Sequence, residues 1–331
     1  TSTNFGIRSS NDIVITGDGK LTITAEFPTI QGKNITIDGA KLDLTTTGVD
    51  LAAIENNNLL VIKNNAKVKA KGYGAALSSF GKMEVTNSEL DLEATRDSSN
   101  AIYVEATNAD GTLSITNSKI KAKSGYACVF SARDMKLSNS NFNLESIAGG
   151  IYSNTSVSID NSKVYVSDGN YGVGVGQGDI TINNSNFEIN VNNVAFMYNP
   201  IINGFDNKII YAGYEKDGTD AEIVTINDEL DLSEYQYVKI ISKYNITIIH
   251  DENIVLEGDN ETLLPYSKMI NKIPNKNKLE FKISLKHFVD TTEQINKEIF
   301  TNKKLLFFAK NSKNIIYADW ESLSFISTDM K

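Results

Sequence analysis

The chain has 331 residues, of which 40% are hydrophobic and 22% charged, so it has enough apolar material for a buried core and is not of the disordered class. Its formal net charge of −9 argues against a nucleic-acid partner, because phosphate binding requires clustered Lys and Arg. The single cysteine, Cys128, excludes an intrachain disulfide, and no apolar run approaches the roughly 18 residues of a membrane span.

A ten-residue pattern recurs between Val85 and Val191 with an Asn-Ser pair always in the same place: VTNSELDLEA, ITNSKIKAKS, LSNSNFNLES, IDNSKVYVSD and INNSNFEINV. The recurring asparagines follow one another at intervals of 22 to 30 residues. A repeat of about this length is typical of a solenoid. The asparagines of this slot are Asn64, Asn87, Asn117, Asn139, Asn161 and Asn184, and Gly39 occupies it one unit earlier.

Each unit reads as three short strands, because apolar and polar residues alternate in three segments. Between Gly111 and Ala132 these segments are TLSIT, KIKAK and YACVFSA. Three strands per coil with one face inward predict an all-β fold, a right-handed parallel β-helix of about eight coils over residues 11–199. On this alignment Phe130, Phe142 and Phe187 point into the core. The outward positions of the third strand are Arg8, Ala76, Tyr103, Val129, Tyr152, Gly174 and Phe196.

The recurring Asn lies between the first and second strands, where the chain must turn sharply. Asn and Gly tolerate the left-handed backbone region that such a turn requires. At the coil spacing the amides of stacked asparagines are also able to bond to one another, and the following Ser is small enough for the bend. We therefore expect a structural turn ladder at this corner.

The pattern of residues 5–199 resembles the right-handed parallel β-helix repeats of secreted and wall-attached proteins of Gram-positive bacteria, some described as carbohydrate-binding. The segment NKIIYAGYEKDGTDAEIV…YQYVKI (207–240) is similar to the tail that often follows such repeats. The resemblance implies an extracellular or cell-surface location, with targeting signals outside this fragment, and a glycan or a surface protein as partner. It supplies no functional residue.

After residue 199 the period is lost. We expect a cap over residues 200–243, because the last coil would otherwise expose unpaired strand edges. Residues 244–331 predict a small β-rich or α+β module. Its one helix is expected in DTTEQINKEIF (290–300), where Thr291 and Gln294 form a capping box.

The outward face of the second strand carries charges of alternating sign, for example Asp43, Lys69, Asp91 and Lys121. One interpretation is a polysaccharide lyase or glycoside hydrolase face, in which acids bind calcium and a Lys acts as base. The other is cross-strand pairing of opposite charges, which the alternation itself predicts. We favour pairing.

Two further sets of residues are candidate ligand contacts. Arg96 and Asp97 lie in the loop of the longest coil, where insertions often carry function, and Arg133 and Asp134 follow in the next coil. Aromatic side chains on the outer face of the third strand are suited to contact a sugar. The candidate contacts are Arg96, Asp97, Arg133, Asp134, Tyr103 and Tyr152.

The sequence contains few residues and motifs that are suited to catalysis. His250 and His287 are the only histidines, and no HExxH motif or phosphate-binding loop occurs, so we predict no catalytic residue, metal or cofactor. The acidic segment 215–222 lacks EF-hand spacing and is expected to be a turn. Cys128 is expected to be buried. A non-catalytic surface module, adhesin-like or carbohydrate-binding, is therefore the expected function, with a polysaccharide-cleaving enzyme and a purely structural spacer rod as alternatives.

Overall fold

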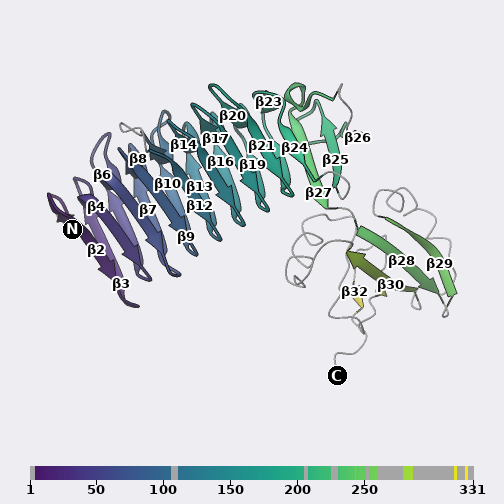
Figure 1. Cartoon of the computed structure of the whole chain (residues 1–331), viewed down its shortest axis with the longest axis horizontal. Coiled ribbons are helices and arrows are strands. Elements are labelled where there is room, and N and C mark those ends of the chain that lie inside the picture. The colour runs from purple at the N-terminus through teal and green to yellow at the C-terminus, as the bar shows by residue number, and fades with distance from the viewer. Residues whose placement is uncertain are drawn as a thin grey trace. The chain divides into compact units, whose positions relative to one another are not determined.

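A computed structural model shows two compact units, one of residues 1–205 and 210–241 and the other of residues 206–209 and 242–331. It describes residues 4–105, 111–204, 208–224 and 230–241, and the backbone of 242, 244–250, 253–259, 279–285, 317–318 and 325–326. The first unit is the predicted parallel β-solenoid of about eight turns, and its strands stack side by side along its length (Figure 1).

Each coil of the solenoid contributes three strands. The first strands are β2 (Ile13–Thr16), β9 (Lys82–Thr86), β12 (Leu113–Thr116), β15 (Met135–Ser138), β18 (Val157–Asp160), β21 (Ile180–Asn183) and β24 (Ile201–Asn203). The second strands are β3 (Lys20–Ala25), β5 (Lys41–Thr46), β7 (Lys67–Gly72), β10 (Glu89–Ala94), β13 (Lys119–Ser124), β16 (Asn141–Ser146), β19 (Lys163–Ser167) and β22 (Asn186–Asn190). The third strands are β1 (Ile7–Arg8), β8 (Ala75–Ser79), β11 (Asn100–Val104), β14 (Ala127–Ser131), β17 (Gly149–Ser153), β20 (Tyr171–Val175) and β23 (Val194–Phe196).

Two long strands, β4 (Ile30–Asp38) and β6 (Ala52–Lys63), join a third strand to the first strand of the next coil. Through them the first and third strands form a 16-stranded sheet, whereas the second strands belong to a separate 11-stranded sheet. The pairings between coils are parallel, for example Leu90 with Ile120 and Ile120 with Phe142, and a register shift occurs in the pairing of β4 with β6, between Gly32 and Asn34. Each coil therefore repeats the shape of the one before it.

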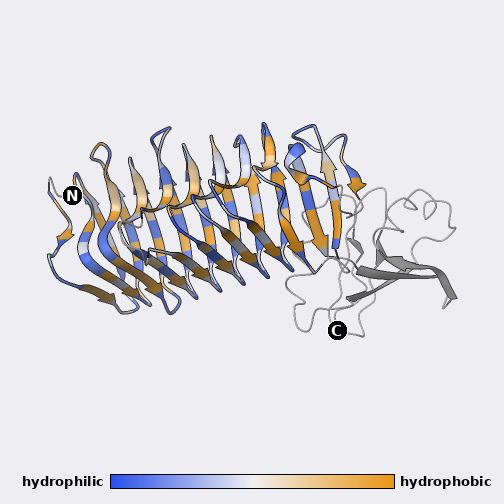
Figure 2. Ribbon diagram, turned by 45° about the horizontal axis from the view of Figure 1, so that its top comes forward, coloured by the Kyte–Doolittle hydropathy of each residue, from blue (hydrophilic) through white to orange (hydrophobic). Residues whose placement is uncertain are grey.

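The core lies inside the coil, between the two sheets. The predicted inward residues of the first and second strands are buried in the repeat, including Phe142 at 0% and Phe187 at 2% exposure. Figure 2 shows the resulting alternation of hydrophobic and hydrophilic residues along the strands of the solenoid. The two-residue period of the sequence predicted this face correctly.

The predicted outward positions of the third strand were wrong in three coils. Ala76, Val129 and Phe196 are fully buried, whereas Phe130 points outward, beside Tyr103 and Tyr152. The reason is that consecutive residues are buried where this strand begins, so the alternation is interrupted there. The residue before the first large inward side chain is always small: Ala53, Ala76, Ala101, Cys128, Gly150, Gly172 and Ala195.

At the corner between the first and second strands, six asparagines and Gly39 adopt the left-handed backbone conformation, with φ between 46° and 70°. The serine that follows the Asn connects the coils: Ser88 N–H donates to Ser118 Oγ at 3.1 Å, and Ser118 N–H donates to Ser140 Oγ at 3.0 Å. Each of these hydroxyls in turn donates to the carbonyl two residues before it. We call this row the serine ladder: Ser88, Ser118, Ser140, Ser162 and Ser185.

Side-chain amides also connect coils. At the asparagine corner Asn64 Nδ2 donates to Asp38 Oδ1 at 2.7 Å, and two further rows lie in other columns. Asn58 donates to Asn34, and Asn34 donates to Asp12, at 2.8 and 2.7 Å. Near the C-terminal end of the solenoid, Asn203 Nδ2 donates to Asn183 Oδ1 at 2.7 Å, and Asn183 Nδ2 donates to the Asp160 carboxylate. Both rows end on a carboxylate, which accepts but does not donate.

Beyond β24, the described strands β25 (Lys208–Gly213), β26 (Glu222–Val224) and β27 (Tyr237–Ser242) continue the sheet of second strands. A 3₁₀ turn, η2 (Leu232–Glu234), lies between β26 and β27. Strand β27 pairs antiparallel with β22, with Ile240 opposite Phe187. The last second strand therefore has its edge covered by a strand of opposite direction.

In the second unit, β28 (Tyr244–His250), β29 (Asn253–Asp259) and β30 (Leu279–Leu285) form an antiparallel sheet in the order β29-β28-β30. β31 (Tyr317–Ala318) pairs with β32 (Phe325–Ile326). The predicted helix over residues 290–300 and His287 lie outside the described residues.

Phe142→Ala tests the core. Because this ring is fully buried, its removal should lower the free energy of unfolding by about 3–5 kcal/mol. Lys121→Ala, on the solvent-facing side of the adjacent strand, is the control and should change it by less than about 1 kcal/mol. Equal losses in urea melts would show that the two faces are reversed.

Gly150→Ala tests the small-residue corner. A β-carbon there would lie 2.7 Å from Gly172 O and from both Val166 methyl groups, so overpacking should lower stability by about 1–3 kcal/mol. The matched control is Gly19→Ala, whose β-carbon would meet no atom within 4 Å. Unchanged denaturation midpoints for both variants would contradict a tightly closed corner.

Candidate functional site

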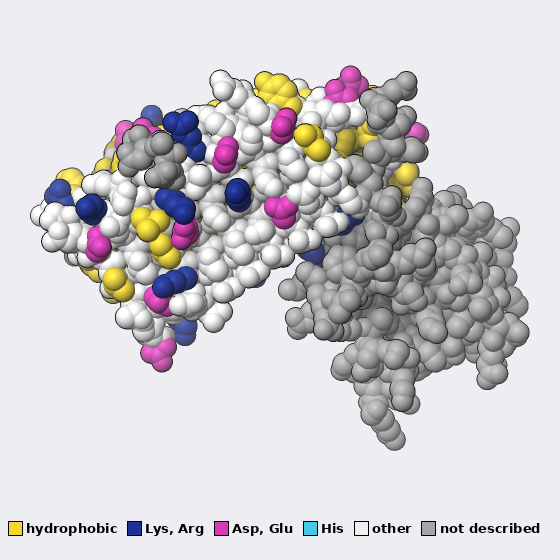
Figure 3. Space-filling model, viewed as in Figure 1, with side chains coloured by type: hydrophobic (Ala, Val, Ile, Leu, Met, Phe, Trp, Pro, Cys, Tyr) yellow, Lys and Arg dark blue, Asp and Glu magenta, His cyan; other side chains and the backbone are white. Residues whose placement is uncertain are grey.

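The outer face of the second strands carries a block of charges ordered by strand. Strand β7 presents Lys67, Lys69 and Lys71, β10 presents Glu89, Asp91 and Glu93, and β13 presents Lys119, Lys121 and Lys123. A basic, an acidic and a basic strand thus lie side by side. On the face shown in Figure 3, dark-blue and magenta side chains are likewise interspersed.

Ion pairs cross this block from strand to strand. Glu89 binds Lys67 at 3.2 Å and Lys119 at 3.3 Å, and these lysines hold the pKa of Glu89 below its usual value. Glu93 binds Lys71 at 2.8 Å. The pairing interpretation of the alternating signs therefore describes the geometry, and within the described residues no group of three His, Cys, Asp or Glu is placed to hold a metal ion.

A column of stacked rings lies on the outer face of the third strands. Tyr103 and Phe130 have ring centroids 5.2 Å apart with planes at 17°, and Phe130 and Tyr152 are 6.0 Å apart at 9°. We call Tyr103, Phe130 and Tyr152 the aromatic ladder. Tyr171 adjoins its end, 5.9 Å from Tyr152 and tilted by 59°.

Because the ladder rings face one another along the solenoid, they present mainly edges and hydroxyl groups to solvent. Burial, and then the Glu105 carboxylate, raises the pKa of Tyr103. Burial likewise raises the pKa of Tyr152. Both hydroxyls therefore remain protonated hydrogen-bond donors at neutral pH, beside apolar ring edges.

A row of exposed apolar side chains lies next to the ladder, at the corner between the second and third strands. In three successive coils this corner exposes Phe27 by 38%, Val49 by 70% and Tyr73 by 39%. After one coil without such a residue it exposes Tyr126 by 41% and Ile147 by 59%. We call these five residues the apolar edge. Their repetition at one corner makes a strip along the solenoid.

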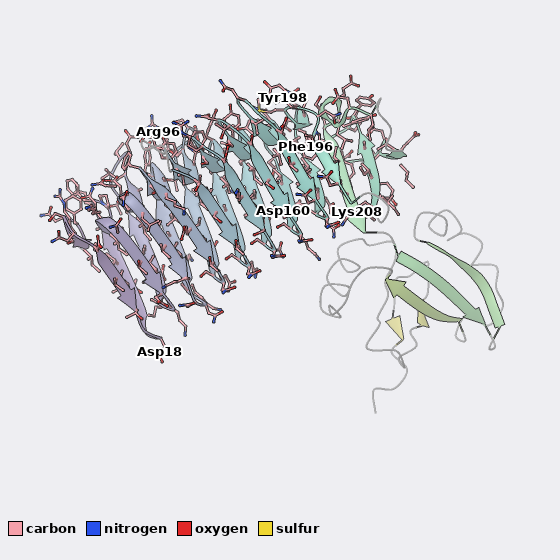
Figure 4. All side chains as sticks on the ribbon, in the orientation of Figure 1. Asp18, Arg96, Asp160, Phe196, Tyr198 and Lys208 are labelled. Carbon is pink, nitrogen blue, oxygen red and sulfur yellow. The ribbon has the colours of Figure 1, made fainter. Side chains whose placement is uncertain are left out.

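The charged candidates are not brought together. Arg96 and Asp97 lie between β10 and β11, at the same corner as the apolar edge. Arg96 forms an ion pair there with Asp50, two coils away. Arg133 and Asp134 lie between β14 and β15, at the other end of the third strand. Figure 4 shows Arg96 on the edge opposite Asp18, which marks the asparagine corner. Arg96 and Asp97 thus lie at the corner before the third strand, and Arg133 lies at the corner after it, where its carbonyl accepts a hydrogen bond from Ser153 Oγ at 2.8 Å, next to Tyr152.

The acidic segment 215–222 is a turn stabilised from within. Asp220 accepts hydrogen bonds from the backbone N–H groups of Tyr214 and Glu215 at 2.8 and 3.0 Å, and Asp217 accepts from Thr219 N–H at 3.1 Å. The carboxylates are therefore occupied by the turn.

The sequence placed Tyr103 and Tyr152 on the outer face but did not indicate that Phe130 and the apolar edge lie at the surface too. The available signal was that Tyr126 directly precedes a third strand and that Tyr73 lies two residues before one. The aromatic ladder and the apolar edge together form the candidate ligand-binding surface.

Comparison with known proteins adds no relative: no family model, no curated protein and no solved structure matches this chain. In the part of the chain that the structure describes, no helix is long and apolar enough to cross a membrane.

Cys128 should be inert in the folded protein. Burial raises the pKa of its thiol to about 12, so thiolate is scarce at pH 8. We expect negligible reaction with an aromatic disulfide reagent in buffer and full reaction in urea. Because the unfolded thiol ionises near pH 8.5, this group should also lower stability as the pH rises above that value toward 12. Rapid labelling of the native chain would contradict the burial.

Proposed function

We propose that the solenoid is a non-catalytic, cell-surface or secreted binding module of the adhesin or carbohydrate-binding type. The observation that supports this is the apolar edge, five large side chains exposed at one corner of the solenoid, next to the aromatic ladder. Large apolar side chains that are exposed together on one side of a soluble protein often mark a surface that contacts a ligand.

The chemistry of the surface favours a glycan. A sugar ring has apolar C–H groups and hydroxyls, and tyrosine offers both an apolar ring and a hydroxyl donor. Since the ladder rings cover one another, the exposed corner residues Tyr73 and Tyr126 supply the most accessible aromatic contacts of this surface. The coil spacing of about 4.8 Å repeats these contacts along the axis, which suits an extended chain of sugars.

The test is a glycan array run with the whole chain, beside an assay for unsaturated uronate release. Tyr126→Ala should weaken binding to any positive glycan about tenfold, as expected for losing one well-packed ring. Tyr103→Ala and Arg96→Ala should also weaken it. Tyr165→Ala is the matched control, because this ring is 39% exposed on the second-strand face.

Equal loss on Tyr165→Ala would contradict this binding surface. Turnover of any polysaccharide would overturn the non-catalytic proposal in favour of a lyase or hydrolase. Absence of both binding and turnover would support a structural rod or a module that binds a surface protein.

A further inference from the structure

The Asn-Ser pairs of the repeat and the Asn203-Gly204 pair are sequences in which asparagine is prone to deamidation. In such a pair the backbone nitrogen after the asparagine loses its proton to solvent base and attacks the side-chain carbon Cγ. A five-membered succinimide forms, and the amide nitrogen leaves as ammonia. Water then opens the ring to aspartate or isoaspartate. Asparagine is among the least durable residues in proteins for this reason.

Exposure alone does not distinguish these pairs, because the asparagines of the serine ladder and Asn203 are all exposed. Hydrogen bonding does. In four pairs the attacking nitrogen is held, since the N–H groups of Ser88, Ser118, Ser140 and Ser162 each donate to the serine hydroxyl of the next coil at 3.0–3.1 Å. A backbone nitrogen held in this way must break its hydrogen bond to the serine hydroxyl before it can attack Cγ.

Asn203-Gly204 lies beyond the end of the serine ladder. Both residues are exposed, and Gly204 N–H donates no hydrogen bond within the described part of the chain. Gly204, at φ +83°, also has no side chain to hinder the approach of its nitrogen. We propose that Asn203 is a site of spontaneous deamidation in the folded protein, whereas the four ladder pairs are protected.

The modification would disturb the last coil. Asn203 Nδ2 donates to Asn183, which donates to Asp160, so this row of hydrogen bonds runs toward a carboxylate. Deamidation replaces the Asn203 amide, which donates to Asn183, with a carboxylate. The row then has a carboxylate at each end, at residue 203 and at Asp160. Whichever way the Asn183 amide turns, its oxygen then faces a carboxylate, and the pairing of β24 with β21 is weakened.

The experiment is to age the whole chain in mildly alkaline buffer and to follow each Asn peptide by mass spectrometry. We expect Asn203 to convert at least about tenfold faster than Asn87, Asn117, Asn139 or Asn161, given a held nitrogen in those four pairs. In urea the four should become labile. Equal rates at Asn203 and the four in the folded chain would overturn the proposal.

Two variants separate protection from sequence. Ser118→Ala removes the hydroxyl that holds Ser88 N–H, so Asn87 should convert faster while Asn139 serves as the internal control. Asn203→Asp mimics one product and should lower the melting temperature, and adding Asp160→Asn should restore it by reversing the row. An unchanged deamidation rate at Asn87 would refute protection by the Ser118 hydroxyl. A melting temperature that does not recover in the double variant would refute the role of the Asn203–Asn183–Asp160 row.

Discussion

The solenoid depends on one constraint: each strand must bond to the equivalent strand of the next coil, in register and about 4.8 Å away. All other features follow from keeping successive coils identical in shape. The first corner requires a left-handed residue, which Asn provides in six coils. The second corner requires a small residue, because a β-carbon at Gly150 or Gly172 would meet the neighbouring coil's backbone. The serine ladder then satisfies the N–H groups that the first corner turns away from the sheets.

Much of this fold could be predicted from the sequence, because the first and second strands alternate strictly and the Asn-Ser pair marks the corner between them. Phe142 and Phe187 were placed correctly for that reason. The third strand misled the same reasoning. It begins with consecutive buried residues, as at Ala127, Cys128 and Val129, so counting by twos from Cys128 placed Phe130 in the core. Packing at the corner, and not strand period, decides that register.

The candidate surface was less predictable for a related reason. Tyr103 and Tyr152 lie on a strand, where alternation predicts the outward face, but Phe130 joins them only once the register is corrected. The apolar edge lies in corners whose length differs between coils, so no sequence period aligns Val49 with Tyr126. Arg96 and Arg133 follow different strands of their coils, and this separation is a property of the coil path that spacing alone does not reveal.

The strand-ordered charges limit how such a protein is able to lengthen during evolution. Solenoids grow when one repeat is duplicated, which places a coil beside its own copy. A copy of the β7 coil would set three lysines against three lysines, and a copy of the β10 coil three acids against three acids, both unfavourable in parallel neighbours. A copy of the β19 coil would repeat only Lys163, Tyr165 and Ser167. Duplication is therefore best tolerated toward the C-terminal coils. Duplicating a coil of the charged block would destabilise the solenoid by placing like charges side by side.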